Sequence, residues 1–134
     1  MRVTADTNFL LSATQWTYSV SHKLLKKLIG IDCKIFTTSE ILSEFAEVLA
    51  RDFHYTKEEI RGRVEKLIPI LTIVNTGKII NVVERDPDDN IIVACALASS
   101  SDYIITYDKD LLDIVEHNGI KIVRPEILLE MLGK

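Results

Sequence analysis

The chain has 134 residues, a length typical of one compact domain, and 47% of its residues are hydrophobic and 27% charged. This balance excludes a disordered or fibrous protein and predicts a single folded domain over residues 1–134. The net charge of -4 excludes an overall cationic field for nucleic acid, so a nucleic-acid partner would need a local basic patch or a metal ion. The chain starts without the apolar stretch of a secretory signal, and its longest apolar run, residues 91–98, is too short for a membrane span. We therefore expect a cytoplasmic protein in which Cys33 and Cys95 are reduced, buried thiols.

The first part of the chain predicts a strand followed by two helices. Residues 2–5 are expected to be the strand, and the polar segment 6–8 can cap a helix that begins near Phe9. A second helix is predicted over residues 19–29, with Gly30 as its stop. Its apolar stripe consists of Val20, Leu24, Leu25, Leu28 and Ile29.

Two further helices follow a second short strand at residues 34–38. Thr38 or Ser39 can cap the first of them, whose apolar residues recur at helical spacing. The next helix begins at the capping box formed by residues 56–59, and Pro69 is expected to kink or end it. The buried face predicted for this helix consists of Ile60, Val64, Leu67, Ile68 and Leu71.

The second half continues the alternation, with an extended stretch at 71–74, a loop at 75–78 and a helix from Pro87 to about Ser100. This helix is apolar nearly all round, which predicts burial between layers. The remaining expected elements are a strand at 103–106, a helix at 109–115, a strand at 121–123 and a helix at 125–132. Alternating strands and helices favour an α/β fold with a mostly parallel sheet and helices on both faces.

Four acidic residues are expected at one edge of this sheet. Asp6 and Asp108 each follow a predicted strand, and ligands of open parallel sheets collect beyond the carboxyl ends of the strands. Asp89, at the start of a helix, and Glu44, inside a helix that follows a strand, can reach the same edge. Carboxylates about 4 Å apart repel by about 4 kcal/mol near a protein surface, so the group needs a cation. Oxygen ligands favour Mg²⁺ or Mn²⁺, which could activate water for attack on a phosphodiester.

A single acid at a strand end or helix start is more often a cap or a solvated residue. We interpret Asp86 and Asp88 in this way, as a cap and a first-turn acid, and Glu40 and Glu47 as solvated helix surface. Glu44 is the acid most easily confused with its neighbours, because Glu40 and Glu47 lie on adjacent turns. The combination of four acids therefore carries the metal hypothesis.

The chain resembles the PIN domain family, and within it the bacterial and archaeal VapC-like toxin components of toxin-antitoxin systems. The segments that carry the resemblance come in the family's order and cover nearly the whole chain: ADTNFLLSA at 5–13, SEILSE at 39–44, DPDDN at 86–90 with ACAL at 94–97, and ASSSDYIITYDKDLL at 98–112. The resemblance implies a three-layer α/β/α sandwich around a central, mostly parallel, Rossmann-like sheet.

The resemblance also implies an acidic quartet that binds Mg²⁺ or Mn²⁺: Asp6, Glu44, Asp89 and Asp108. Asn8 and Thr106 would support it, and Asp110 would add a supporting contact or a second-metal contact unless it only caps its helix. Tyr107 stands where many relatives carry Gly, which is expected to narrow the approach to Asp108.

The function implied is that of a metal-dependent ribonuclease, the toxin of a toxin-antitoxin pair, with an RNA substrate, a cognate antitoxin and a homodimeric assembly. The main alternative is a non-catalytic PIN-like module that binds RNA or protein. The basic residues Lys57, Arg61, Arg63 and Lys66 could contact RNA phosphate or simply be solvated.

Other Mg²⁺-binding classes fit the sequence less well. A phosphatase that forms an aspartyl phosphate at Asp108 would need further motifs for which too little chain remains, and a phosphoacceptor domain would need an acid ending a central strand, whereas Asp52 follows a helix. Residues 86–97 do not form a calcium loop, because they lack its sixth-position Gly and Leu97 takes the place of the twelfth-position Glu.

Overall fold

The computed structural model describes residues 1–76 and 87–133, with the side chains of residues 87 and 88 left out. Within these ranges, six strands form one sheet in the order β3-β2-β1-β4-β6-β5. The strands are β1 (Arg2–Ala5), β2 (Lys34–Thr37), β3 (Leu71–Ile73), β4 (Tyr103–Ile105), β5 (Glu116–His117) and β6 (Ile120–Val123). All described pairs are parallel except that of β5 with β6. The predicted mostly parallel sheet is confirmed.

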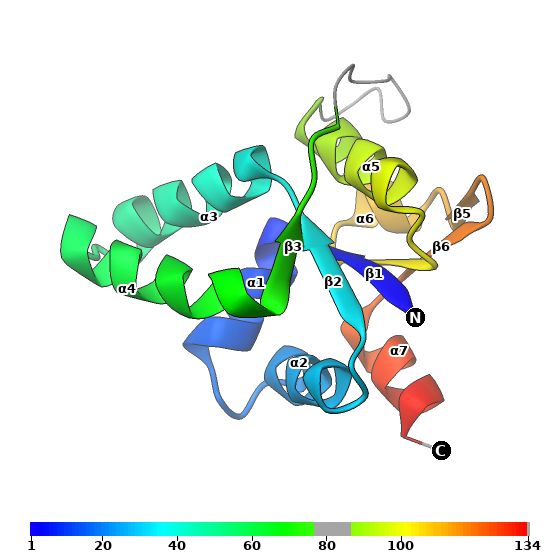
Figure 1. Cartoon of the computed structure of the whole chain (residues 1–134), viewed down its shortest axis with the longest axis horizontal. Coiled ribbons are helices and arrows are strands. Elements are labelled where there is room, and N and C mark those ends of the chain that lie inside the picture. The colour runs from blue at the N-terminus through cyan, green and yellow to red at the C-terminus, as the bar shows by residue number, and fades with distance from the viewer. Residues whose placement is uncertain (77–86, 134) are drawn as a thin grey trace.

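Seven α-helices in the described part of the chain surround this sheet: α1 (Thr7–Gln15), α2 (Val20–Gly30), α3 (Ser39–Asp52), α4 (Lys57–Leu67), α5 (Pro87–Ser99), α6 (Lys109–Leu112) and α7 (Pro125–Leu132). Helix α5 contacts β1, β2 and β4 on one face, while α2 contacts β2 on the other and packs against α1 and α7. The helices α3 and α4 form an antiparallel arm on one side of the molecule (Figure 1). The fold is the predicted three-layer α/β/α sandwich.

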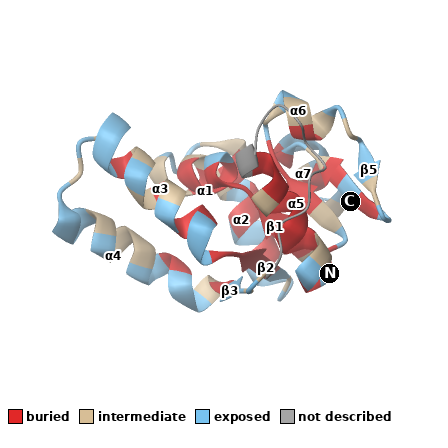
Figure 2. Cartoon of the chain, turned by 90° about the horizontal axis from the view of Figure 1, so that it is seen from above, coloured by how far each residue is buried: buried red, intermediate tan, exposed pale blue. Residues whose placement is uncertain are grey.

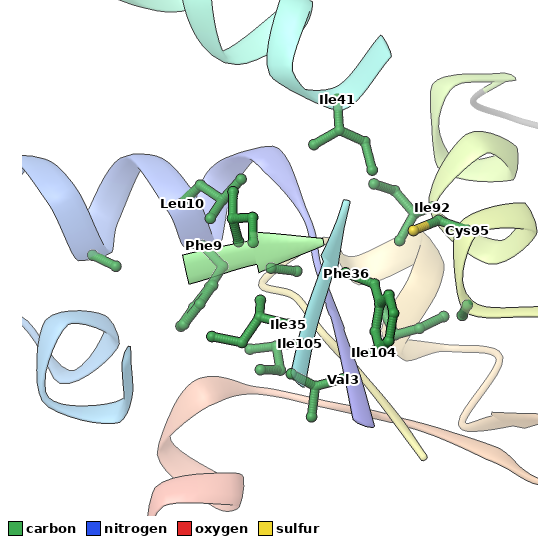
Figure 3. Packing of buried hydrophobic residues seen from close by; sticks show 14 of the residues in the cluster. Val3, Phe9, Leu10, Ile35, Phe36, Ile41, Ile92, Cys95, Ile104 and Ile105 are labelled. Carbon is green, nitrogen blue, oxygen red and sulfur yellow. The ribbon is translucent and has the colours of Figure 1, made fainter. Parts of the chain in front are cut away.

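The core lies on both faces of the sheet, because side chains alternate along each strand. Phe36 and Ile104 point toward Cys95 of α5, whereas Ile35 and Ile105 point toward Phe9 of α1 (Figure 3). Helix α5 is buried on most of its described surface, in contrast to α4, which is largely exposed (Figure 2). The expectation that α5 is buried between layers is confirmed, and this helix carries Asp89 into the interior.

Local sequence signals explain most helix starts. Ser19 accepts a hydrogen bond from the His22 N–H at 3.0 Å, and Thr38, rather than Ser39, caps α3 through the Ile41 N–H. The capping box predicted from residues 56–59 is present at the start of α4. Because these side chains bond the first amides of each helix, the starts of the helices are fixed by short polar residues.

Several predicted boundaries were wrong by a few residues. Helix α1 begins at Thr7 and not near Phe9, because Asp6 itself is the cap. Helix α6 ends at Leu112 and not at residue 115, and Val115, the expected last residue, has a positive φ of 69° that a right-handed helix does not accommodate. Strand β4 ends one residue earlier than expected, at Ile105.

The predicted burial was only partly right. Ile29 and Ile68 are exposed rather than part of a buried face, and Cys33, Ile60 and Val64 are only half-buried. Ile68 lies beyond the end of α4, in the 3₁₀ helix Ile68–Ile70 that contains Pro69, so it no longer follows the apolar stripe. The loop expected at 75–78 lies partly outside the described residues. No helix in the described residues is long and apolar enough to cross a membrane.

Candidate metal centre

The register of β1 and β4 brings two distant parts of the sequence together. Ala5 pairs with Ile105, so Asp6 and Thr106, the next residues of each strand, lie side by side at the carboxyl edge of the sheet. The Thr106 hydroxyl donates a hydrogen bond to Oδ2 of Asp6. Oγ1 of Thr106 in turn accepts a hydrogen bond from the Asp108 N–H at 2.9 Å. Thr106 therefore links the two acids that end these strands.

Asp6 and Asp108 are held in place because each caps a helix. Oδ1 of Asp6 accepts the Phe9 N–H at 2.7 Å at the start of α1. Oδ1 of Asp108 accepts the Asp110 N–H at 2.8 Å at the start of α6. Each carboxylate keeps a second oxygen, so capping and ligand binding are compatible roles for the same side chain. From the sequence, helix cap and metal ligand were alternative roles, but Asp6 and Asp108 can each cap a helix and still offer an oxygen to a cation.

A cavity of about 140 Å³ opens at this edge of the sheet. It is lined by Asp6, Thr7, Asn8, Glu44, Asp89, Ile92 and Asp108. All four acids of the predicted quartet and Asn8 therefore meet in one place, although they come from the β1–α1 junction, α1, α3, α5 and the β4–α6 connection. Asp6 and Asp89 are 5% and 6% exposed, Glu44 and Asp108 are half-buried, and Asn8 is exposed at the rim. The cavity is thus acidic at its base and open to solvent.

Asp110 lies closer to the acids than its capping position suggested. Carboxylate oxygens of Asp89, Asp108 and Asp110 all lie within 4.8 Å of one another. At that separation, two full negative charges repel by about 3 kcal/mol at the effective dielectric of a protein surface. The arrangement therefore favours a bound cation, and three oxygens at this spacing are a plausible ligand set for one.

The buried and acidic surroundings of Asp6 raise its pKa. Burial of the carboxyl group is the largest cause that raises its pKa, from 3.8 to about 6. Hydrogen bonds from Thr106 and from the Phe9 N–H oppose this change, while the negative charges of Asp108 and Glu44 add to it. Without a cation, Asp6 therefore takes up a proton at a higher pH than an ordinary carboxyl group.

The donor set fits a hard divalent cation. The oxygens around the cavity come from carboxylates, one amide and one hydroxyl, and in the part of the chain that the structure describes no histidine or cysteine lines it. Such ligands suit Mg²⁺ or Mn²⁺ and disfavour softer metals such as Zn²⁺.

The acids that were interpreted from the sequence as caps or as helix surface can be checked where the structure describes them. Glu40 and Glu47 are exposed on α3 and do not line the cavity. The interpretation of Asp86 as a cap and of Asp88 as a first-turn acid falls outside the described residues and side chains. Tyr107 is not among the described residues that line the cavity; its hydroxyl donates to Oε1 of Glu126 at 2.7 Å and lies 3.3 Å from Oγ of Ser21, and the narrowing expected from it stays a prediction.

Two cavity residues were missed by the sequence reasoning. Thr7 and Ile92 both line the cavity, yet Thr7 was treated only as part of a helix cap and Ile92 only as core. Both have a signal in the sequence: Thr7 follows Asp6 directly, and Ile92 lies one helical turn beyond Asp89. Residues that follow a candidate ligand directly, or that lie one helical turn from it, are thus candidates themselves.

Comparisons with known proteins agree with this geometry. A family model described as "PIN domain" matches residues 2–110. Among solved structures, the chain is similar to a chain of the VapBC2 complex from Rickettsia felis, which was crystallised bound to a DNA fragment from its promoter. The TM-score is 0.66 at 16% sequence identity, and the match covers 92% of this chain and 98% of that one. No curated protein sequence matches the chain.

Proposed function

The chain belongs to the PIN domain family, and from that premise we propose that it is a Mg²⁺- or Mn²⁺-dependent endoribonuclease. The observation that carries the proposal is the acidic cavity at the carboxyl edge of the sheet, which gathers Asp6, Glu44, Asp89 and Asp108. We propose these four residues as the ligands of the cation, with Asn8, Thr106 and Asp110 supporting them. A nuclease of net charge -4 needs such a cation to accept an RNA phosphate near its own acids.

In the proposed reaction, water attacks the phosphorus of an RNA phosphodiester and the bond to the leaving oxygen breaks. A bound divalent cation supplies activation of water and neutralisation of charge on the phosphate. The chain positions the carboxylates: the Thr106 hydroxyl donates to that of Asp6, and the Asp110 N–H at the start of α6 donates to that of Asp108. The exposed amide of Asn8, at the rim, can donate to a phosphate oxygen.

The basic residues of α4 are candidates for contact with the rest of the RNA. Lys57, Arg61 and Lys66 are exposed, so their charges can reach a phosphate. Arg63 differs, because its guanidinium packs 5.3 Å from the centre of the Tyr55 ring and donates to the Tyr55 hydroxyl at 3.3 Å. Phosphate contact is therefore proposed for the three exposed residues.

The rival proposal is a module of the same fold that binds RNA or protein without cutting it. Retention of all four acids around one cavity supports the nuclease, since a binding module gains nothing from their mutual repulsion. The experiment is cleavage of a mixed panel of single-stranded and structured RNAs with added Mn²⁺. Matched reactions use Asp6→Asn, which removes a proposed ligand, and Glu47→Gln, which removes an exposed charge from α3.

We expect cleavage by the wild type and by Glu47→Gln, no cleavage by Asp6→Asn, and loss of all cleavage after chelation. Cleavage that continues after exhaustive chelation would exclude the metal mechanism. Binding of RNA by the wild type without any cleavage at saturating Mn²⁺ would favour the non-catalytic module.

The biological setting forms a second part of the proposal. The similar solved structure is of a VapBC2 complex, which supports an antitoxin partner for this chain and a role as the toxin. We propose that this toxin acts on RNA in the cytoplasm. A homodimer is the assembly that the family resemblance implies. Sedimentation of the purified chain tests the dimer, and co-purification with the product of an adjacent reading frame tests the antitoxin.

A further inference from the structure

Thr7 carries a buried hydroxyl that the fold does not use. It is the first residue of α1, directly after Asp6, and it is 5% exposed at the wall of the acidic cavity. Its Oγ1 atom is buried and has no hydrogen-bond partner among the described residues. Nearly all buried polar side chains in native proteins have a partner, because an unmade hydrogen bond costs free energy. The hydroxyl therefore needs an explanation.

Helix capping does not supply one. The Phe9 N–H, which a polar side chain at the start of α1 would satisfy, is already bonded to Asp6. By contrast, the Thr14 hydroxyl of the same helix donates to the Leu10 carbonyl oxygen at 2.7 Å. A valine at position 7 would fill nearly the same volume without burying an unsatisfied oxygen. The fold alone thus gives no reason for a hydroxyl at this position.

We propose that Thr7 is a further positioning residue of the candidate metal centre, whose Oγ1 accepts a hydrogen bond from a water molecule of the hydrated divalent cation. Mg²⁺ in proteins usually keeps several waters, and these donate to oxygens around the site. Turning the Thr7 side chain to another staggered position breaks no hydrogen bond to the described residues, so the hydroxyl is available to a ligand. The inference rests on the proposed cation site, but not on RNA cleavage.

The chain offers a matched control for this inference. Thr37 ends β2, is fully buried, and its Oγ1 also has no hydrogen-bond partner in the described part of the chain. It does not line the acidic cavity. Thr7→Val and Thr37→Val therefore remove the same kind of buried hydroxyl, one from a residue that lines the acidic cavity and one from a residue that does not.

The test measures two quantities on four proteins: wild type, Thr7→Val, Thr7→Ser and Thr37→Val. The first is the melting temperature in EDTA, and the second is the Kd for Mn²⁺ by isothermal titration calorimetry. We expect both valine variants to melt at or above the wild-type temperature in EDTA. Only Thr7→Val should bind Mn²⁺ more weakly, by about tenfold, since loss of a supporting partner typically weakens metal affinity 10- to 100-fold. Thr7→Ser should bind like the wild type.

Equal Mn²⁺ affinity of Thr7→Val and the wild type would overturn the inference while leaving the proposed metal site intact. A large fall in the melting temperature of Thr7→Val in EDTA, with Thr7→Ser unaffected, would also overturn it, because the hydroxyl would then serve the fold. If the wild type binds no Mn²⁺, the proposed metal site itself fails.

Discussion

Replacing Asp6 by Asn should stabilise the metal-free protein at neutral pH. The pKa of Asp6 in the fold is about 6, above the 3.8 of an ordinary aspartate, chiefly because the carboxyl is buried. The folded state therefore binds the proton more tightly than the unfolded state, and wild-type stability falls as the pH rises from about 4 to about 6. The difference between the two pKa values corresponds to roughly 3 kcal/mol of folding stability, which the wild type loses when Asp6 ionises. The amide that replaces this carboxyl in the variant carries no charge, so the variant avoids this loss.

Part of this gain is offset by a changed hydrogen bond. The amide oxygen can still accept the Phe9 N–H, but the amide nitrogen cannot accept the proton that Thr106 donates to Asp6. A lost hydrogen bond costs about 1 kcal/mol, which leaves a net gain of about 2 kcal/mol. For a domain of this size, that gain raises the melting temperature by roughly 5–10 °C.

The assay is thermal unfolding in EDTA from pH 4 to pH 8, with Glu47→Gln as the control for loss of an exposed acid. Near pH 4 the variant should melt slightly below the wild type, because only the lost hydrogen bond counts there. The order should reverse as the pH rises from about 4 to about 6, and the full gain should be present above pH 6. Saturating Mn²⁺ should then reverse the order, because a ligand at one hundred times its Kd stabilises the wild type by about 2.7 kcal/mol. A lower melting temperature for Asp6→Asn than for the wild type at pH 8 in EDTA would refute this reasoning, because the hydrogen bond from Thr106 would then outweigh the cost of the buried charge.

Three other substitutions test the site. Thr106→Val, which removes the link between two acids, should weaken Mn²⁺ binding about 10- to 100-fold by calorimetry; unchanged affinity would contradict the linking role. Glu44→Gln should slow RNA cleavage by at least about 100-fold, whereas Glu47→Gln should stay within about twofold, and equal rates would displace Glu44 from the ligand set. Asp89→Asn should slow cleavage by orders of magnitude. Asp113 is an exposed acid paired with a lysine, so the control substitution Asp113→Asn should leave the cleavage rate and the melting temperature unchanged.

The layers of the fold and the meeting of the acids were predictable because both follow from simple periodicities. Residues after parallel strands share one edge, so Asp6 and Asp108 had to converge once β1 and β4 were recognised. The antiparallel strand β5 was missed although a signal for it was present. Asn118 and Gly119 both have positive φ and form the turn of the β5–β6 hairpin, and Asn-Gly is typical of such turns.

Other features depended on information that local patterns do not hold. The direction of the Tyr107 side chain is set by Glu126 and Ser21, which belong to helices distant in sequence. The approach of Asp110 to Asp89 depends likewise on how α5 and α6 pack. A residue's place in a helix is readable from sequence, but its neighbours across the fold are not.

The hydrogen bond between Thr106 and Asp6 spans 100 residues of chain. Contacts of such long sequence separation close large loops and form slowly compared with local helices. The order of synthesis adds to this delay, because Asp6, Glu44 and Asp89 are all synthesised before Thr106 and Asp108. An incomplete nascent chain, or a fragment that ends before β4, thus carries three of the four proposed ligands without the strand that brings them into register. The acidic edge is assembled only when the molecule is nearly complete.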